Sequence, residues 1–268
     1  MLKTALFFIV MNLNAFFSDG LQLVPSYVTN KMFVNGKNIV RNKLLPSLCC
    51  WISLLSTSVA VPFADGKEFT MVDVKQLRNE GVDAFRNGDI ELSVKKFNTI
   101  LAEAPDLYPY LWQRGLSLYY LNSYATCAAQ FNFDSKVNAN DYEETIWASV
   151  CENGQRQETS PSQPMILSHA LKLKDPRPIM NEIQSVFRGE SSPEDLLQRV
   201  VSNTAKASDF FYSRLYMGLY YESRGEEGDK AKSLACIEEA LQSPYAQQGG
   251  DYMVDVAKVH YKLRRPTT

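Results

Sequence analysis

Apolar side chains recur at helical spacing through most of the chain. In residues 72–152 and again in residues 206–265, apolar residues return every three or four positions. This period marks one buried face of an α-helix. Apolar and polar residues nowhere alternate strictly for long enough to predict a strand. The pattern therefore predicts an all-α fold whose helices pack through their apolar faces.

Two consecutive segments in this region match each other in register, residues 74–107 and residues 108–141. Both fit the template of the tetratricopeptide repeat (TPR), a helix–turn–helix unit of 34 residues. Gly115 lies one full period of 34 residues after Gly81. The fit predicts a TPR-type helical solenoid of antiparallel helix pairs. About three or more units are expected, because a single repeat cannot bury its own apolar face.

The small residues of the two repeats have a predicted packing role. Two helices cross closely only where one side chain is small, so Gly81 with Ser93, and Gly115 with Cys127, are the expected contact points. A third pair is predicted at Phe210–Leu241, with Gly218 as its small residue.

The segment between the second and third pairs is less regular. A helix is predicted over Tyr142–Glu152, and the polar stretch Gly154–Pro164, which contains two prolines, is predicted to be a loop. A last helix, Gly250–Leu263, has apolar residues at helical spacing and is expected to cap the stack.

The first 66 residues differ in composition from the rest. They hold five basic and two acidic residues, a net charge of +3 in a chain whose total is −2. Residues 1–15 show the order of regions of a secretory signal peptide. A transit segment that begins at Phe16 follows, and it contains a second apolar stretch, Leu44–Phe63.

These three stages resemble the layered targeting of proteins into complex plastids of algal type, which implies the thylakoid lumen as destination. Two alternatives stay open. Leu44–Phe63 is nearly long enough to be retained as a membrane anchor, or the leader is a plain secretory signal with a disordered spacer. The predicted organisation is a signal peptide at 1–15, a second targeting segment at 16–66, TPR repeats at 72–152, an irregular helical insertion at 153–205, and a C-terminal TPR-like repeat with a capping helix at 206–265.

The sequence predicts no catalytic, cofactor or metal site. His169 and His260 lie far apart, and no phosphate-binding loop, nucleophile elbow or metalloprotease motif is present. Cys127, Cys151 and Cys236 lack metal-ligand spacing, and we expect them to be small packing residues without a disulfide. A net charge of −2 without a polybasic stripe does not indicate a nucleic-acid partner.

The order of parts also resembles a known group. Two regular repeats containing LWQRGLSLYY lead to NANDYEETIW, an irregular middle follows, and FYSRLYMGLYYESRGE opens the third pair. This arrangement is similar to that of the NlpI-type TPR adaptors of the bacterial periplasm and their plastid relatives, although the irregular middle departs in sequence. The resemblance implies a docking platform for other proteins, without catalysis of its own.

A TPR stack presents the first helix of each repeat on its concave face. At these positions the chain offers a basic edge beside an aromatic floor, which suits an extended peptide with an acidic or carboxylate group. The predicted partner-binding residues are Lys75, Arg78, Phe85, Arg86, Trp112, Leu116, Tyr119 and Tyr120. In the alternative interpretation the aromatic residues pack against the irregular middle, and the two arginines are solvated charges.

A conventional carboxylate clamp is disfavoured, because Val82 and Gln113 stand where the TPR co-chaperones carry asparagine. The function predicted from the sequence is therefore a non-catalytic scaffold or assembly adaptor for a partner protein or peptide. One alternative is a permanently bound structural subunit of a thylakoid membrane complex, which predicts a large exposed apolar patch. Another is an enzyme with an unrecognised site in the irregular middle.

Overall fold

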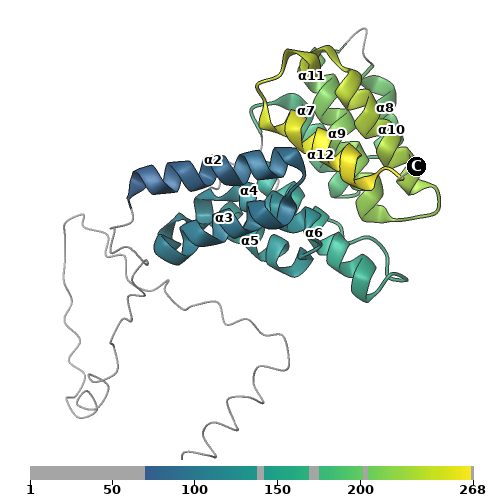
Figure 1. The fold of residues 1–268 in the computed structure, drawn as a ribbon. Helices are drawn as coiled ribbons and strands as arrows, with labels where there is room; N and C mark the ends of the chain where they lie inside the picture. Colours follow the sequence, from purple (N-terminus) through teal and green to yellow (C-terminus); the bar gives the residue numbers. More distant parts are fainter. Residues whose placement is uncertain (1–69, 138–141, 169–174, 202–204, 267–268) are drawn as a thin grey trace, which may run out of the picture. The chain divides into compact units, whose positions relative to one another are not determined.

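The structure is a computed structural model that describes residues 70–137, 142–168, 175–201 and 205–266, all of them in the unit Phe63–Thr268. Within these residues every regular element is a helix and none is a strand, which confirms the all-α prediction (Figure 1). The expectations for the targeting segments at 1–66 lie outside the described residues. None of the described helices combines the length and the apolar character needed to cross a lipid bilayer.

The first hairpin consists of α2 (Met71–Asn87) and α3 (Ile90–Glu103). Thr70 and Asp73 form a capping box at the start of α2, which satisfies backbone N–H groups that have no partner inside the helix. Gly88 ends the helix in the left-handed region, with φ 80°, where a side chain would be strained.

The second hairpin follows a short 3₁₀ helix, η1 (Pro105–Tyr110), and consists of α4 (Trp112–Tyr120) and α5 (Tyr124–Val137). α6 (Glu143–Thr159) packs along α5. After it come α7 (Pro178–Phe187), α8 (Pro193–Arg199), the third hairpin of α9 (Ala207–Arg224) and α10 (Asp229–Gln242), then α11 (Pro244–Gln248) and α12 (Tyr252–Arg264).

The hairpins cross at the predicted glycines. A Cβ added to Gly81 would lie 3.0 Å from the ring of Phe97, and one added to Gly115 would lie 2.6 Å from the ring of Phe131. Both rings belong to the second helix of the same hairpin. The third hairpin repeats the arrangement, since a Cβ added to Gly218 would lie 2.8 Å from the side chain of Ile237.

The small residues predicted to meet the first two glycines have other partners. The hydroxyl oxygen of Ser93 lies 2.8 Å from that of Ser117, so it joins α3 of the first hairpin to α4 of the second. Cys127 in α5 forms a disulfide with Cys151 in α6, and their Cα atoms are 5.8 Å apart. The prediction that these cysteines are unpaired is therefore wrong. The pairing depends on how α5 packs on α6, and the spacing of cysteines along the chain does not contain that information.

α6 is longer than predicted, because it continues through Gly154 to Thr159. Packing explains the difference: a Cβ added to Gly154 would lie 2.5 Å from the ring of Tyr124. The buried guanidinium of Arg156 donates hydrogen bonds to the carbonyls of Ser223 (2.8 Å) and Arg224 (2.9 Å), near the end of α9. Residues 155–158 are also good helix formers, so these tertiary contacts add to local propensity, and the helix ends before the prolines at 161 and 164.

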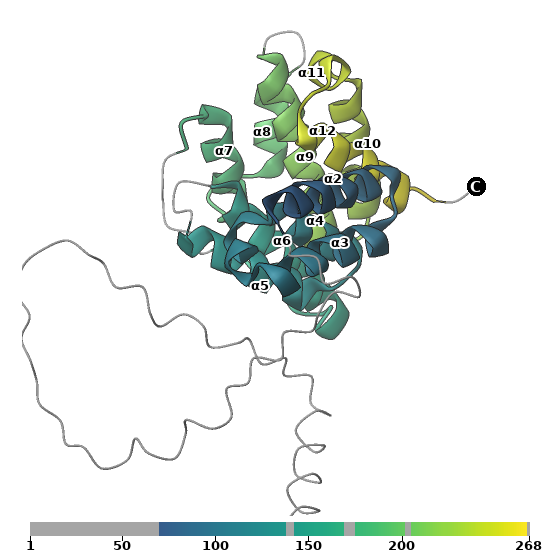
Figure 2. The same ribbon diagram turned by 60° about the vertical axis from the view of Figure 1, so that its left-hand side comes forward.

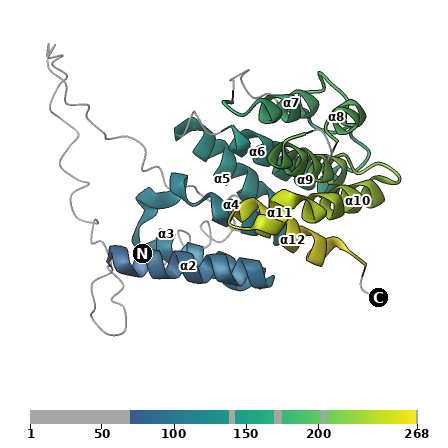
Figure 3. The same ribbon diagram turned by 90° about the horizontal axis from the view of Figure 1, so that it is seen from above.

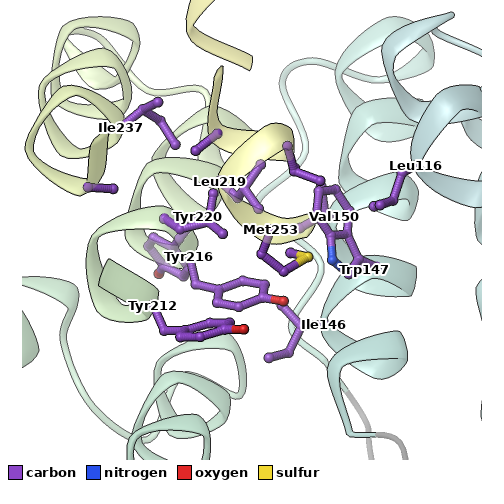
Figure 4. Close-up of a cluster of buried hydrophobic side chains, with 14 of the residues drawn as sticks. Leu116, Ile146, Trp147, Val150, Tyr212, Tyr216, Leu219, Tyr220, Ile237 and Met253 are labelled. Atoms are coloured by element: carbon purple, nitrogen blue, oxygen red, sulfur yellow. The ribbon is translucent and has the colours of Figure 1, made fainter. Parts of the chain in front are cut away.

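A large apolar core contains residues of all three hairpins, and Figure 4 shows part of it. A second, smaller cluster of Val74, Phe97, Ile100 and Leu111 lies at the first hairpin. Trp147 of α6 lies between Phe131 of α5, whose ring centroid is 6.0 Å away, and Tyr216 of α9, at 6.5 Å. Met253 of α12 belongs to the same core. The C-terminal helix is thus part of the packed body and continues the stack of helices.

Candidate partner-binding face

The structure places the predicted partner-binding residues on two helices, α2 and α4, but in different surroundings. Four of them are buried: Phe85, Leu116, Tyr119 and Tyr120. Lys75 and Arg86 are exposed, and Arg78 and Trp112 are half-buried. Half of the predicted residues are therefore covered by the chain itself, and only the basic residues and Trp112 reach the solvent.

α12 contacts Phe85, Trp112 and Tyr120, whereas Tyr119 also packs against Trp147 of α6. Figures 1, 2 and 3 all show the yellow α12 beside the C-terminal end of the blue α2. The ring of Tyr252 stacks on Phe85 with a centroid distance of 5.7 Å. The same ring meets Trp112 edge-on at 5.1 Å. Residues of three helices thus form one aromatic cluster.

Polar contacts hold the same two helices together. Arg86 forms an ion pair with Asp255 at 2.7 Å, and its guanidinium lies over the ring of Tyr252. Lys262 donates a hydrogen bond of 2.7 Å to the carbonyl of Asn87 at the end of α2. These groups are partly exposed, so the charge attraction is weakened by solvent and the aromatic contacts dominate.

Near the end of α12 a polar cluster closes the face. Glu222 of α9 accepts hydrogen bonds from Tyr119 (2.5 Å) and from Arg264 (2.6 Å). His260 lies 3.1 Å from the hydroxyl of Tyr120, joined through its Nδ1 atom. We call Phe85, Arg86, Trp112, Tyr119, Tyr120 and Glu222 together the α12-binding face.

Burial shifts the titration of this cluster. Burial lowers the pKa of His260 below its ordinary value, and the nearby Arg264 lowers it further, while Glu222 opposes both. Burial alone would raise the pKa of Glu222, but His260, Arg264 and the hydrogen bond from Tyr119 outweigh it, so that pKa is lowered. Glu222 is therefore a carboxylate near neutral pH, and His260 is a neutral imidazole.

Three polar atoms of α12 make no hydrogen bond to the described residues although they are buried: Tyr252 Oη, His260 Nε2 and Arg264 Nη2. A buried polar group without a partner costs about 1–3 kcal/mol. All three belong to side chains that touch the α12-binding face. The contact between α12 and this face is therefore well packed in its apolar part and incomplete in its polar part.

A cavity of about 420 Å³ lies beside the polar cluster. It is lined by Tyr124, Gln157, Tyr221, Glu222, Gly225, Glu226, Lys230, Ser233, Leu234, His260 and Arg264. Among the described residues no hydrogen bond joins Ser233 to His260, so the lining does not form the nucleophile–base pair that covalent catalysis requires. The part of the chain that the structure describes also has no group of His, Cys, Asp or Glu that could hold a metal ion.

Sequence reasoning missed the α12 side of this site. The sequence does not indicate Tyr252, Asp255 or Arg264 as site residues, and it predicts no catalytic or metal-binding role for His260. The signal in the sequence is the width of the apolar stripe over residues 253–259. A helix that only caps a stack needs a narrower apolar face. The sequence did not indicate which helices this stripe would meet.

The titration of the cluster predicts that acid destabilises the fold. An unfolded histidine has a pKa of about 6.5, above that of buried His260, so the unfolded state binds more protons as the pH falls below that value. We expect the free energy of unfolding to decrease between about pH 7 and pH 5.5, by up to about 1.4 kcal/mol per pH unit. Urea unfolding across this range measures it.

The control for this effect is His260→Gln, which keeps a polar side chain but removes the titrating group. Its unfolding free energy should vary less over the same pH range than that of the wild type. Equal pH dependence in the two proteins would show that His260 is not the group responsible. Below about pH 4.5, loss of the Glu222 carboxylate should destabilise both proteins.

No protein-family model matches the chain, and no curated protein matches it either. Its function must therefore be argued from its own contacts.

Proposed function

We propose that this chain is a non-catalytic TPR-type scaffold that holds a partner protein. The observation that supports this most is the close crossing of each hairpin at a glycine, with Gly81 and Gly115 one repeat period apart. Such a crossing brings the two helices of one hairpin into close contact, and the contact of Ser93 with Ser117 joins the first hairpin to the second, as in a repeat solenoid. Solenoids bind partners along the surface that their stacked helices present.

The part of the predicted face that α12 leaves free is the N-terminal half of α2 with η1. Here Met71, Val72 and Tyr110 are exposed apolar residues, at 72%, 73% and 51%. Lys75 is exposed beside them, and Arg78 donates a hydrogen bond to the carbonyl of Tyr110. We name these five residues the open end. Its apolar and basic character suits a partner segment with apolar and acidic side chains.

The compartment is part of the proposal. A lumenal or other extracytoplasmic location agrees with the predicted targeting segments and with the NlpI-type resemblance. The Cys127–Cys151 disulfide supports it, because structural disulfides persist in oxidising compartments and are rare in a reducing cytosol. Retention of Leu44–Phe63 as an anchor would instead keep the same domain at a membrane surface.

Affinity purification with a C-terminal tag tests the proposal. We expect Lys75→Glu and Arg78→Glu each to reduce the co-purifying partner about tenfold, because reversed charge repels an acidic segment. Lys95→Glu is the matched control, since Lys95 is an exposed lysine of α3 outside the open end. Equal loss in the control, or no loss in either variant, would contradict binding at the open end.

The same purification separates the structural-subunit alternative. A permanently bound subunit would co-purify with a membrane complex in fixed proportion, and single charge reversals at the open end would leave that proportion unchanged. The mature N-terminus, read by mass spectrometry, tests the compartment. A terminus within residues 60–67 supports the lumen, and one near Phe16 or a retained Leu44–Phe63 contradicts it.

A further inference from the structure

We infer that the α12-binding face is a docking site for an amphipathic helix of a partner protein, and that α12 occupies it as an internal ligand. The inference deepens the proposed function and rests on it. It differs from the sequence prediction in the form of the ligand, a helix instead of an extended peptide. It also adds regulation, because the face opens only when α12 leaves.

α12 itself shows what the face binds. Tyr252, Asp255, Val256, Val259 and His260 follow one another at the spacing i, i+3, i+4, i+7 and i+8, which places them on one side of the helix. Recognition of a helix through apolar anchors at this spacing is a common mode of binding.

Each end of this side meets a distinct part of the α12-binding face. At the start, the ring of Tyr252 packs between Phe85 and Trp112, and Asp255 pairs with Arg86. At the other end, His260 meets the hydroxyl of Tyr120. Residues of α2 and α4 therefore specify the aromatic and charged contacts at both ends, Glu222 of α9 pairs with Arg264, and α10 packs against the apolar side of α12.

α12 is an imperfect ligand for this face. The hydroxyl of Tyr252, Nε2 of His260 and Nη2 of Arg264 are buried without a hydrogen-bond partner among the described residues. A native contact that is optimised only for stability satisfies such groups. A competing helix with phenylalanine in place of Tyr252, or with acceptors for the other two groups, would leave fewer unpaired atoms.

The connection to α12 allows it to leave. Gly249 and Gly250 link α11 to α12 with φ values of 68° and 92°. Both are exposed, and a Cβ added to either would meet nothing within 4 Å. The two glycines therefore make no packing contact of their own and have wide backbone freedom. Asp251, the next residue, accepts hydrogen bonds from Tyr212 (2.7 Å) and Tyr245 (2.6 Å), and these two contacts break when α12 leaves.

The partner is expected to supply a helix with an aromatic residue at its first anchor, an acidic residue three positions later and aliphatic residues four and seven positions later. The acidic residue would take the place of Asp255 against Arg86. The aliphatic residues would replace Val256 and Val259, which are buried in the common core.

The probe for the test is a fluorescein-labelled peptide with the sequence of residues 250–266, added to the full chain. Two protein variants weaken the internal ligand. Asp255→Arg replaces the ion pair to Arg86 with repulsion, and an insertion of a few Gly-Ser residues between Gly249 and Gly250 lowers the effective concentration of α12 without changing any side-chain contact. Glu238→Arg on the exposed side of α10 has the same charge change as Asp255→Arg and is the control.

Fluorescence anisotropy should show at least about tenfold tighter peptide binding to both variants than to the wild type and the control. A peptide with Tyr252→Ala should bind none of them measurably. Circular dichroism establishes that each variant is folded, and the insertion variant keeps the test decisive if Asp255→Arg unfolds.

Equal peptide binding by wild type, control and insertion variant would overturn the inference. Light scattering gives a second way to overturn it: a dimer of the insertion variant would show that a second copy of this chain is the preferred occupant. The outcomes for the proposed function stay separate. If Lys75→Glu loses the partner but no variant binds the peptide, the proposed scaffold function is supported and the helix-docking site is contradicted. If the variants bind the peptide but no partner co-purifies, the helix-docking site is supported and the scaffold function is contradicted.

Discussion

Replacing Gly115 with valine is expected to lower the free energy of unfolding by about 3 kcal/mol. A Cβ at this position would lie 2.6 Å from two ring carbons of Phe131, and valine adds two further methyl groups. The ring cannot move aside easily, because Phe131 is 1% exposed and stacks on Trp147. The two helices of the second hairpin would have to separate, and the gain in helix propensity over glycine offsets only about 0.5 kcal/mol.

Urea unfolding followed by far-ultraviolet circular dichroism measures this effect. Ala125→Val is the matched control, since it places the same side chain on an exposed position of α5. We expect it to change the unfolding free energy by less than about 1 kcal/mol. The double variant with Phe131→Leu should recover part of the loss. A Gly115→Val protein as stable as the control would show that the crossing is not tight at this glycine.

The hairpins could be predicted because their determinants are local. Gly81 and Gly115 are in phase, and Gly88 stands where a helix must end in a left-handed residue. Helical periodicity then gives the buried side of each helix without knowledge of the rest of the fold. The side chains nearest to Gly81 and Gly115 are the rings of Phe97 and Phe131, whereas the sequence analysis names Ser93 and Cys127, of which Ser93 also reaches the next hairpin.

The features that could not be predicted depend on residues far apart in the chain. Arg86 pairs with Asp255, 169 positions later, and neither residue has a local pattern that points to the other. The contacts of Arg156 in α6 with the carbonyls of Ser223 and Arg224 join residues 67 and 68 positions apart in the same way. The candidate site belongs to this second class: helical periodicity predicts its α2 and α4 residues, but the contacts of α12 and of Glu222 with them result from tertiary packing.

Glu222→Ala is expected to lower the free energy of unfolding by about 3 kcal/mol, the lower end of the range for breaking a buried ion pair. The carboxylate of Glu222 accepts from Tyr119 and Arg264, so its removal leaves the guanidinium of Arg264 without its counter-charge. The lower end applies because about a quarter of the Glu222 side chain, 24%, is exposed to solvent.

Glu222→Gln separates charge from packing at this position. The amide still offers an oxygen to Tyr119 but no charge to Arg264, so its loss should lie between that of the wild type and that of Glu222→Ala. Glu238→Ala on the exposed side of α10 should change the unfolding free energy by less than about 0.5 kcal/mol. Because Glu222 joins α9 to both α4 and α12, amide hydrogen exchange should also rise in α12 before it rises in α3. Uniform exchange in both helices would show that Glu222 stabilises the whole fold and does not hold α12 in particular.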